Sequence, residues 1–130
     1  MNHVDGDRHV AQSTELRVRA FCRAAFAPAV LVVLIASVID TGASRLPEGS
    51  DKLEHALAFL ALGLLGYPRW PALRLCLALA LYGLSIECIQ WFLPWREFSL
   101  LDWTADAVGV VVAALGARSR RKAGRHEFAR

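Results

Sequence analysis

The stretch Gly83–Gly109, GLSIECIQWFLPWREFSLLDWTADAVG, places acids and amides in a chain whose neighbouring segments are almost entirely apolar. Glu87 and Gln90 are three residues apart, so both side chains lie on one face of a helix. Asp102 and Asp106, four residues apart, share a helix face in the same way. A proline-containing connection separates the two pairs. If the flanking segments are antiparallel membrane helices, both pairs lie just inside the same membrane surface.

The composition indicates a membrane protein with a single domain. The 130 residues are 55% hydrophobic, above the roughly 45–50% that is typical of soluble domains. The formal charge of +3 would suit a nucleic-acid partner. However, the basic residues cluster at the chain ends and in short connections instead of along one helical face. We therefore predict membrane lipids as partners, and no nucleic acid; the sequence makes no prediction of the oligomeric state.

The chain divides into three predicted parts. Residues 1–19 are polar, mixed in charge and without apolar periodicity, which predicts a mobile N-terminal tail. Residues 20–117 form the membrane domain, and residues 118–130 form a basic cytoplasmic tail. The first apolar segment, Ala24 to Ile39, would also suit a secretory signal peptide. We favour a retained span because further apolar segments follow and no convincing A-x-A cleavage site comes after it.

Three more spans are predicted, at about Lys52–Tyr67, Pro71–Leu93 and Leu100–Ala117. The stripe on the third begins small and ends polar, through Cys76, Ala80, Gly83, Glu87 and Gln90. The stripe on the fourth begins polar and ends small, through Asp102, Asp106, Gly109, Ala113 and Gly116. Such stripes match only between antiparallel helices. We therefore predict that small residues of the third span face small residues of the fourth, and that polar residues face polar ones.

These segments predict an all-α fold, a four-helix transmembrane bundle with both termini cytoplasmic. Lysine and arginine dominate the chain ends and the connection between the second and third spans. The positive-inside rule places those parts in the cytoplasm and the polar layer toward the outside of the bacterial cytoplasmic membrane. A soluble four-helix bundle is the alternative. It is disfavoured because the helices are apolar all round and not along one stripe only.

Two acids in the predicted spans require an explanation. Glu87 and Asp106 would each cost roughly 2.5 to 3.5 kcal/mol near the centre of a membrane helix, and less near the interface. They should therefore face the bundle interior, where His55, Gln90 and Arg96 are the candidate partners. The set is either a working site or a polar clasp that pins helix ends together. Ionisable residues inside a membrane favour the working site.

Neither a metal nor a cofactor is predicted. The side chains of His55, Glu87, Asp102 and Asp106 are of types that ligate metals. No local ligand motif such as H-E-x-x-H supports a site, and no cofactor-binding loop is present. The three cysteines lie in or beside apolar runs at unrelated spacings, which is typical of small apolar filler and not of a disulfide or a zinc site.

Several polar motifs recur in a known order. They are Lys52-x-x-His55-x-x-x-Phe59, Glu87-x-x-Gln90, Pro94-x-Arg96, Ser99, Asp102 and Gly109. In order and spacing this series resembles the VanZ-like family of small bacterial membrane proteins, over about Asp51 to Gly116. One departure is Asp106, where the family more usually has asparagine.

The resemblance implies an integral membrane protein, and the family's named member is linked to low-level resistance to the glycopeptide teicoplanin. The family's signature positions fall on His55, Glu87, Gln90, Arg96 and Asp102, with Asp106 at the altered position. We expect these residues to form an outward-facing pocket for the polar part of a cell-envelope component, such as a lipid-linked precursor or a phospholipid head. Arg96 would meet the anionic group. A membrane enzyme acting on a lipid-linked substrate, proton or ion passage along the acids, and a purely structural clasp are the alternatives.

Overall fold

The computed structural model describes residues 3–39 and 50–127, which fold into four helices and no strand. The helices are α1 (His3–Val38), α2 (Ser50–Gly66), α3 (Ala72–Gln90) and α4 (Leu100–Glu127). The predicted all-α class is confirmed. α2 and α3 begin and end within three residues of the predicted spans. α4 begins at Leu100, as predicted, and continues through the first part of the basic tail.

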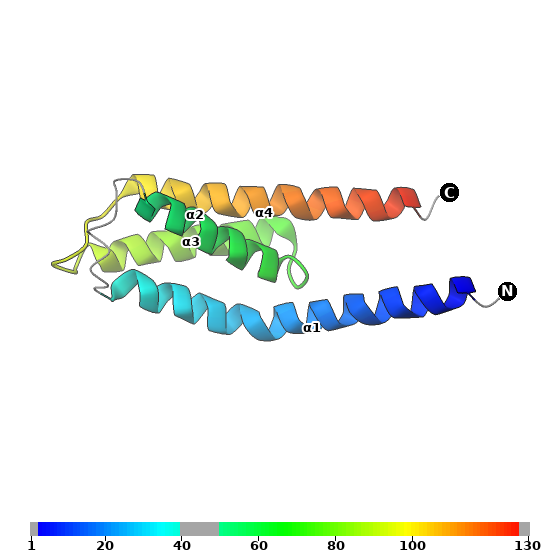
Figure 1. The fold of residues 1–130 in the computed structure, drawn as a ribbon. Coiled ribbons are helices and arrows are strands. Elements are labelled where there is room, and N and C mark those ends of the chain that lie inside the picture. The colour runs from blue at the N-terminus through cyan, green and yellow to red at the C-terminus, as the bar shows by residue number, and fades with distance from the viewer. Residues whose placement is uncertain (1–2, 40–49, 128–130) are drawn as a thin grey trace.

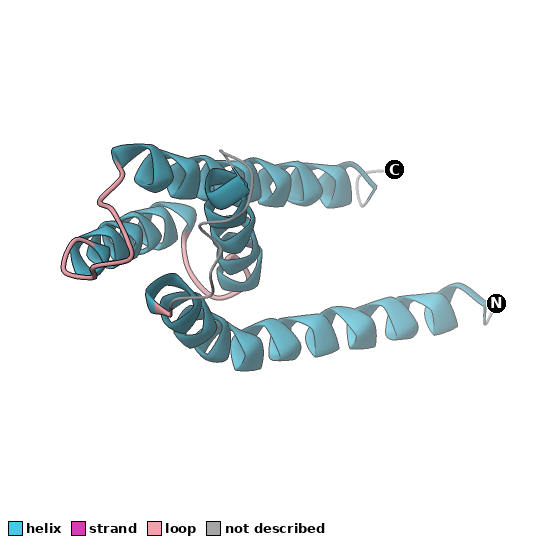
Figure 2. Ribbon diagram, turned by 60° about the vertical axis from the view of Figure 1, so that its left-hand side comes forward, coloured by secondary structure: helices cyan, strands magenta, loops and turns pink. Residues whose placement is uncertain are grey.

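The helices form a bundle in which both termini lie at the same end (Figure 1). α3 and α4 run antiparallel, as the two stripes predicted, and α2 begins beside the start of α4 (Figure 1). α2 crosses the other helices obliquely, which is clearest when the bundle is turned (Figure 2). The end opposite the termini therefore brings together the end of α1, the start of α2, the end of α3 and the start of α4.

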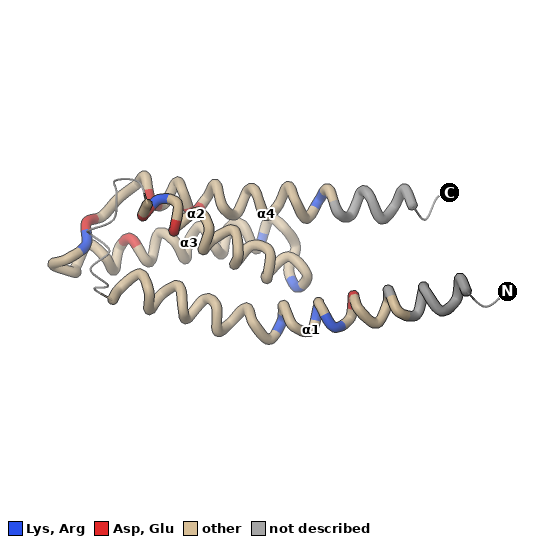
Figure 3. Tube along the Cα trace, viewed as in Figure 1, with Lys and Arg blue, Asp and Glu red and all other residues tan. Residues whose placement is uncertain are grey.

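Within residues 3–39 and 50–127, three segments are long and apolar enough to cross a membrane: Gln12–Val38, Ala72–Gln90 and Leu100–Ser119. α2 has 17 residues, about 26 Å of helix, slightly less than a hydrocarbon core of about 30 Å. Charged residues lie mostly toward the two ends of the bundle, with few of them in the middle (Figure 3). Large apolar side chains are exposed on every helix, including Leu31, Leu57, Leu77 and Val111. This exterior fits contact with lipid.

The segment predicted as a mobile N-terminal tail, residues 1–19, is helical from His3 onward, because α1 begins there and continues unbroken into the apolar segment. Extending an existing helix gains one hydrogen bond for each residue fixed, so an apolar span makes the polar helix before it inexpensive to form. Local contacts add to this. Arg19 pairs with Glu15 at 2.8 Å, and the Thr14 hydroxyl donates to the Val10 carbonyl.

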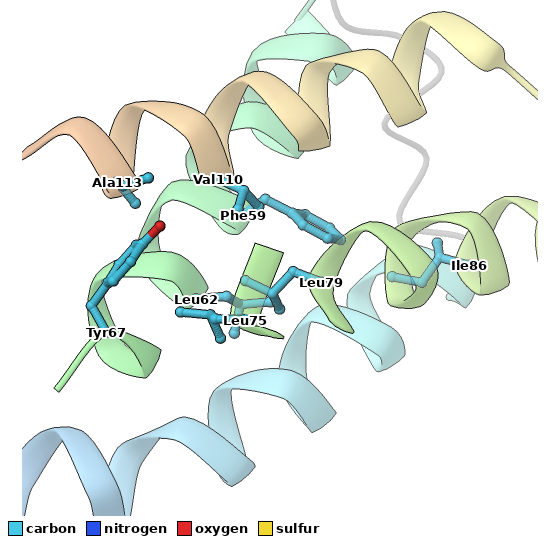
Figure 4. Packing of buried hydrophobic residues seen from close by; sticks show 9 residues of the cluster. Phe59, Leu62, Tyr67, Leu75, Leu79, Ile86, Val110 and Ala113 are labelled. Atoms are coloured by element: carbon cyan, nitrogen blue, oxygen red, sulfur yellow. The ribbon is translucent and has the colours of Figure 1, made fainter. Parts of the chain in front are cut away.

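The buried core is built from α2, the turn after it, α3 and α4 (Figure 4). Its members are Phe59, Leu62, Tyr67, Leu75, Leu79, Ile86, Val110, Ala113 and Ala114. Partly buried residues of α1, including Phe26 and Val30, pack against this cluster from one side. The densest part of the bundle is therefore the three-helix unit α2–α4.

The small residues of α4 pack against α2, which corrects the predicted pairing with the small residues of α3. A β-carbon added at Gly109 would overlap the Ala56 carbonyl oxygen and lie 2.8 Å from the Leu60 nitrogen. A β-carbon added at Gly63 would lie 2.5 Å from Cβ of Ala113. Both helices offer small residues at the crossing, so their backbones approach closely there. Periodicity identified the packing face of α4 but not the helix that it meets.

α1 is attached differently, because none of its described side chains is fully buried. Three side chains of the rest of the bundle donate hydrogen bonds to its backbone carbonyls. The Tyr82 hydroxyl donates to Val30 at 2.6 Å, Gln90 Nε2 to Ser37 at 3.0 Å, and Trp95 Nε1 to Val38 at 3.2 Å. The carbonyls at 37 and 38 belong to the last turn of α1, where no intrahelical N–H is available. Gln90 and Trp95 therefore cap α1.

We predict that Gly109→Ala lowers the free energy of unfolding by about 1–3 kcal/mol, because an overpacked site costs this much when its neighbours are backbone atoms. The measurement is unfolding of the purified protein in mixed micelles by increasing SDS. The matched control is Gly116→Ala on the same helix, where an added β-carbon meets no atom of the described residues within 4 Å. That change should leave stability unchanged or raise it by up to about 1 kcal/mol. Equal effects at the two positions would contradict the close α2–α4 crossing.

Candidate functional site

Glu87 joins the end of α3 to the start of α4. Its side chain is fully buried, and Oε2 accepts a hydrogen bond of 2.8 Å from the backbone N–H of Ser99. The Ser99 hydroxyl oxygen accepts the N–H of Asp102, three residues on, and so caps α4. In a capping box the side chain at that third position would take the N–H of the cap residue. Here Glu87 of another helix takes it, which leaves the Asp102 carboxylate free for other contacts.

Asp106 connects three helices. Its Oδ1 lies 2.9 Å from Nδ1 of His55 on α2, within hydrogen-bond distance. On the other side, a β-carbon at Gly83 of α3 would lie 2.6 Å from Asp106 Oδ2. Only glycine therefore leaves room for this carboxylate, which is 1% exposed. The polar residues of the two predicted stripes do face each other here, with His55 added from a third helix.

Asp102 lies at the rim of this polar layer. Its Oδ1 is 3.7 Å from Nζ of Lys52, and the same ammonium group lies 3.6 Å from Asp51. The Lys52 side chain is 41% exposed, so it remains hydrated and screens Asp102 only in part. The ion pair therefore offsets the Asp102 charge weakly.

The polar layer contains more acceptors than donors. Within the described residues, three buried carboxylate oxygens have no hydrogen-bond partner, namely Glu87 Oε1, Asp102 Oδ1 and Asp106 Oδ2. Buried polar atoms are nearly always paired in folded proteins, so each of these oxygens requires an explanation. In addition, His55, Glu87 and Asp102 each bring one ligating atom within 4.8 Å of the other two. These three residues are the ones that would hold a metal ion.

A pocket of about 280 Å³ lies beside the polar layer, between α1, α2, the end of α3 and the turn after it. Three of the predicted site residues, His55, Gln90 and Arg96, line it, together with Asp51 and Glu54. The structure thus separates the six predicted residues into two groups. His55, Gln90 and Arg96 form part of the pocket wall, and the three acids lie in the bundle interior.

Sequence reasoning gave two residues too small a role and did not predict the contact of a third. Lys52 and Ser99 stood in the quoted motifs, and the structure places them against Asp102 and Glu87. Gln90 was expected to orient a ligand, but its Nε2 donates a hydrogen bond to the Ser37 carbonyl. The signal for Ser99 was its position directly before a helix and three residues before an acid, which is the spacing of a capping box. No comparable local signal identifies Gln90 as a cap of α1.

Comparison with known proteins tests the resemblance that the polar motifs suggested. A protein-family model described as VanZ/LLP1 matches residues 11–121. The chain belongs to the VanZ/LLP1 family. No curated protein and no solved structure matches the chain. The resemblance drawn from the polar motifs is thereby confirmed, and family membership together with three span-length apolar helices makes the chain a membrane protein.

In this VanZ/LLP1 protein we predict that His55 and Asp106 are energetically coupled. Interhelical hydrogen bonds in membranes average about 0.6 kcal/mol and reach about 1.7 kcal/mol, and this buried pair should lie in the upper part of that range. The measurement is a double-mutant cycle with His55→Ala and Asp106→Ala, using unfolding by SDS in mixed micelles. Ser85→Ala with Asp106→Ala is the control cycle, because the exposed Ser85 hydroxyl donates within its own helix, to the Leu81 carbonyl. Coupling no larger than in the control would show that the two side chains do not interact.

Proposed function

We propose that this VanZ/LLP1 protein lies in the bacterial cytoplasmic membrane with both termini inside, and that it binds the polar part of a cell-envelope component from the outer side. Arg17, Arg19 and Arg23 precede the apolar part of α1, and Arg69 and Arg74 lie in the connection between α2 and α3 and at the start of α3. These parts of the chain lie toward the end that carries the termini (Figure 1). The positive-inside rule assigns that end to the cytoplasm. The pocket beside the polar layer lies at the opposite end, and so would open outward.

The observation that carries this proposal is Arg96 on the pocket wall. Its guanidinium has no ion-pair partner among the residues that the structure describes, although acids line the same pocket. An unpaired guanidinium presents two parallel donors that match a phosphate or carboxylate. Glu54, also on the pocket wall, would suit an amine on the same ligand. The wall therefore fits a small head group that carries both charges.

The size of the pocket limits the ligand. A volume of about 280 Å³ is at the lower end of the roughly 300–1,000 Å³ of small-molecule sites. It fits one head group and not a whole lipid, whose chains would remain in the surrounding bilayer. A phospholipid head or the polar end of a lipid-linked envelope precursor meets this requirement. Such a role connects the protein to envelope homeostasis and to the teicoplanin resistance that the family resemblance implies.

A membrane enzyme acting on a lipid-linked substrate is the second candidate. The contact of 2.9 Å between His55 and Asp106 favours it, because a carboxylate commonly orients a histidine that acts as a general base. His55 also lines the pocket, where it would reach a bound head group. Turnover of a lipid-linked substrate that disappears in His55→Gln would establish the enzyme and replace the binding role.

We predict that Arg96→Gln weakens binding of short-chain phosphatidylethanolamine to the detergent-solubilised protein by about tenfold or more, because a hydrogen bond to a charged group contributes about 1.5–3 kcal/mol. Glu54→Gln should weaken binding of this lipid but not of short-chain phosphatidylglycerol, which has no amine. Arg69→Gln is the control, since Arg69 lies over the Trp70 ring at the opposite end of the bundle. Unchanged affinity in Arg96→Gln would refute the role of Arg96.

In cells, we predict that a deletion strain changes in susceptibility to teicoplanin and to envelope stress. The wild-type gene should restore the phenotype, and Arg96→Gln and Glu87→Gln should not, at matched protein levels in the membrane. If the levels of Glu87→Gln collapse while Arg96→Gln complements fully, the polar layer is a structural clasp. In that case the proposed binding role is wrong.

A further inference from the structure

The acids of the polar layer meet one histidine at a point where three helices converge. His55 comes from α2, Glu87 from α3 and Asp102 from α4, and one ligating atom of each lies within 4.8 Å of the others. Two neighbouring ligands of an ion with bonds of 2.0–2.2 Å are separated by about 3.0–3.5 Å. Small side-chain rotations would therefore close the set around one ion.

The unpaired oxygen of Glu87 points independently to a ligand. The residue is 0% exposed, and only its Oε2 is engaged, by the N–H of Ser99. Its Oε1 has no hydrogen-bond partner among the described residues. Leaving a buried carboxylate oxygen unpaired is costly, because the group has lost its water without gaining a donor. A cation bound at this oxygen would remove that cost.

Asp106 is placed to position the histidine. Its Oδ1 lies 2.9 Å from Nδ1 of His55. An ionised carboxylate only accepts, so with Asp106 ionised Nδ1 donates its proton and Nε2 keeps its lone pair. Histidines that bind metals almost always give their second ring nitrogen to a carboxylate or carbonyl, which fixes the tautomer and the ring orientation. The contact between His55 and Asp106 is of this kind.

Charge supports a divalent ion. The layer contains three carboxylates, of Glu87, Asp102 and Asp106, and the described cation nearest to them is the half-exposed Lys52, 3.7 Å from Asp102. One monovalent side chain at that distance does not balance three buried acids. Two positive charges placed among His55, Glu87 and Asp102 would bring the layer close to neutrality.

We propose that His55 Nε2, Glu87 and Asp102 bind one divalent transition-metal ion, with Asp106 as the residue that positions His55. An imidazole beside carboxylates suits Zn²⁺ or Mn²⁺ better than Mg²⁺ or Ca²⁺, which take oxygen ligands. Three protein ligands leave coordination positions open for water or a ligand oxygen. This proposal revises the expectation from sequence that no metal is bound. It stands on the buried cluster alone and does not rest on lipid binding.

The test is the metal content of the full-length protein, purified in detergent without chelator and then stripped with EDTA and titrated with Zn²⁺ and Mn²⁺. We expect about one ion per chain by elemental analysis and a higher unfolding temperature after reloading. Asp102→Asn and His55→Gln should lower the affinity more than Asp106→Asn. Asp106 contacts His55 and not the ion, so its substitution should weaken binding by about 10- to 100-fold. The matched control is Glu97→Gln, an exposed acid at the same end of the bundle, which should bind as the wild type does.

Asp102→Asn decides the test if the more deeply buried variants fail to accumulate, because its side chain is 12% exposed and lies at the rim of the layer. The proposal is supported if Co²⁺ added to the stripped wild type gives a ligand-field absorption that Asp102→Asn changes and Glu97→Gln does not. It is overturned if the wild type binds no ion at micromolar concentrations. Equal affinity of the wild type and Asp102→Asn would overturn it as well. Since no lipid ligand enters these measurements, their outcome is independent of the Arg96 experiments.

Discussion

Burial of three carboxylates in an apolar bundle is the constraint on which the rest of the structure depends. Each acid has to find partners within the protein, because lipid supplies none. Glu87 accepts a hydrogen bond from the N–H of Ser99, which caps α4. Asp106 contacts His55, and Asp102 pairs with Lys52 at the rim of the layer. These contacts tie the end of α3 and the starts of α2 and α4 together. The opposite end of the bundle, where α1 begins and α4 ends, has no such layer among its described residues. Apolar packing stabilises it.

The polar end of the bundle also contributes to the attachment of α1. α1 buries no described side chain fully, but partly buried residues such as Phe26 and Val30 pack against the core, and three donors reach its carbonyls. Two of these donors, Gln90 and Trp95, cap its last turn at the level of the acids. The pocket that contains Arg96 opens between this end of α1 and α2.

Much of this architecture was predictable from sequence. Helical spacing placed Glu87 with Gln90 and Asp102 with Asp106, and the cost of charge in lipid directed Glu87 and Asp106 inward, where the structure has them. Spacing cannot tell which neighbour a face will meet. The stripe of small residues on α4 was therefore predicted to pack against α3. In the structure, Gly109 packs against the backbone of α2. Contacts between residues far apart in sequence, such as Gln90 with Ser37, depend on the tertiary arrangement. For the same reason, the sequence did not predict that His55, Glu87 and Asp102 lie close together. Their ligating atoms come from three helices, and no local motif connects them.

The choice of acids over amides argues against a layer that is only a clasp. Asparagine and glutamine carry donors as well as acceptors, so amides at these positions would pair with one another across the helices. Ionised carboxylates only accept, and the donors supplied here are one backbone N–H, one imidazole and a half-exposed ammonium. Three oxygens therefore have no hydrogen-bond partner within the described residues, and one of them, Asp102 Oδ1, has only the ion pair with Lys52. A clasp made in this way is weaker than its amide equivalent and costlier to bury. The excess of acceptors is instead what the proposed cation would offset.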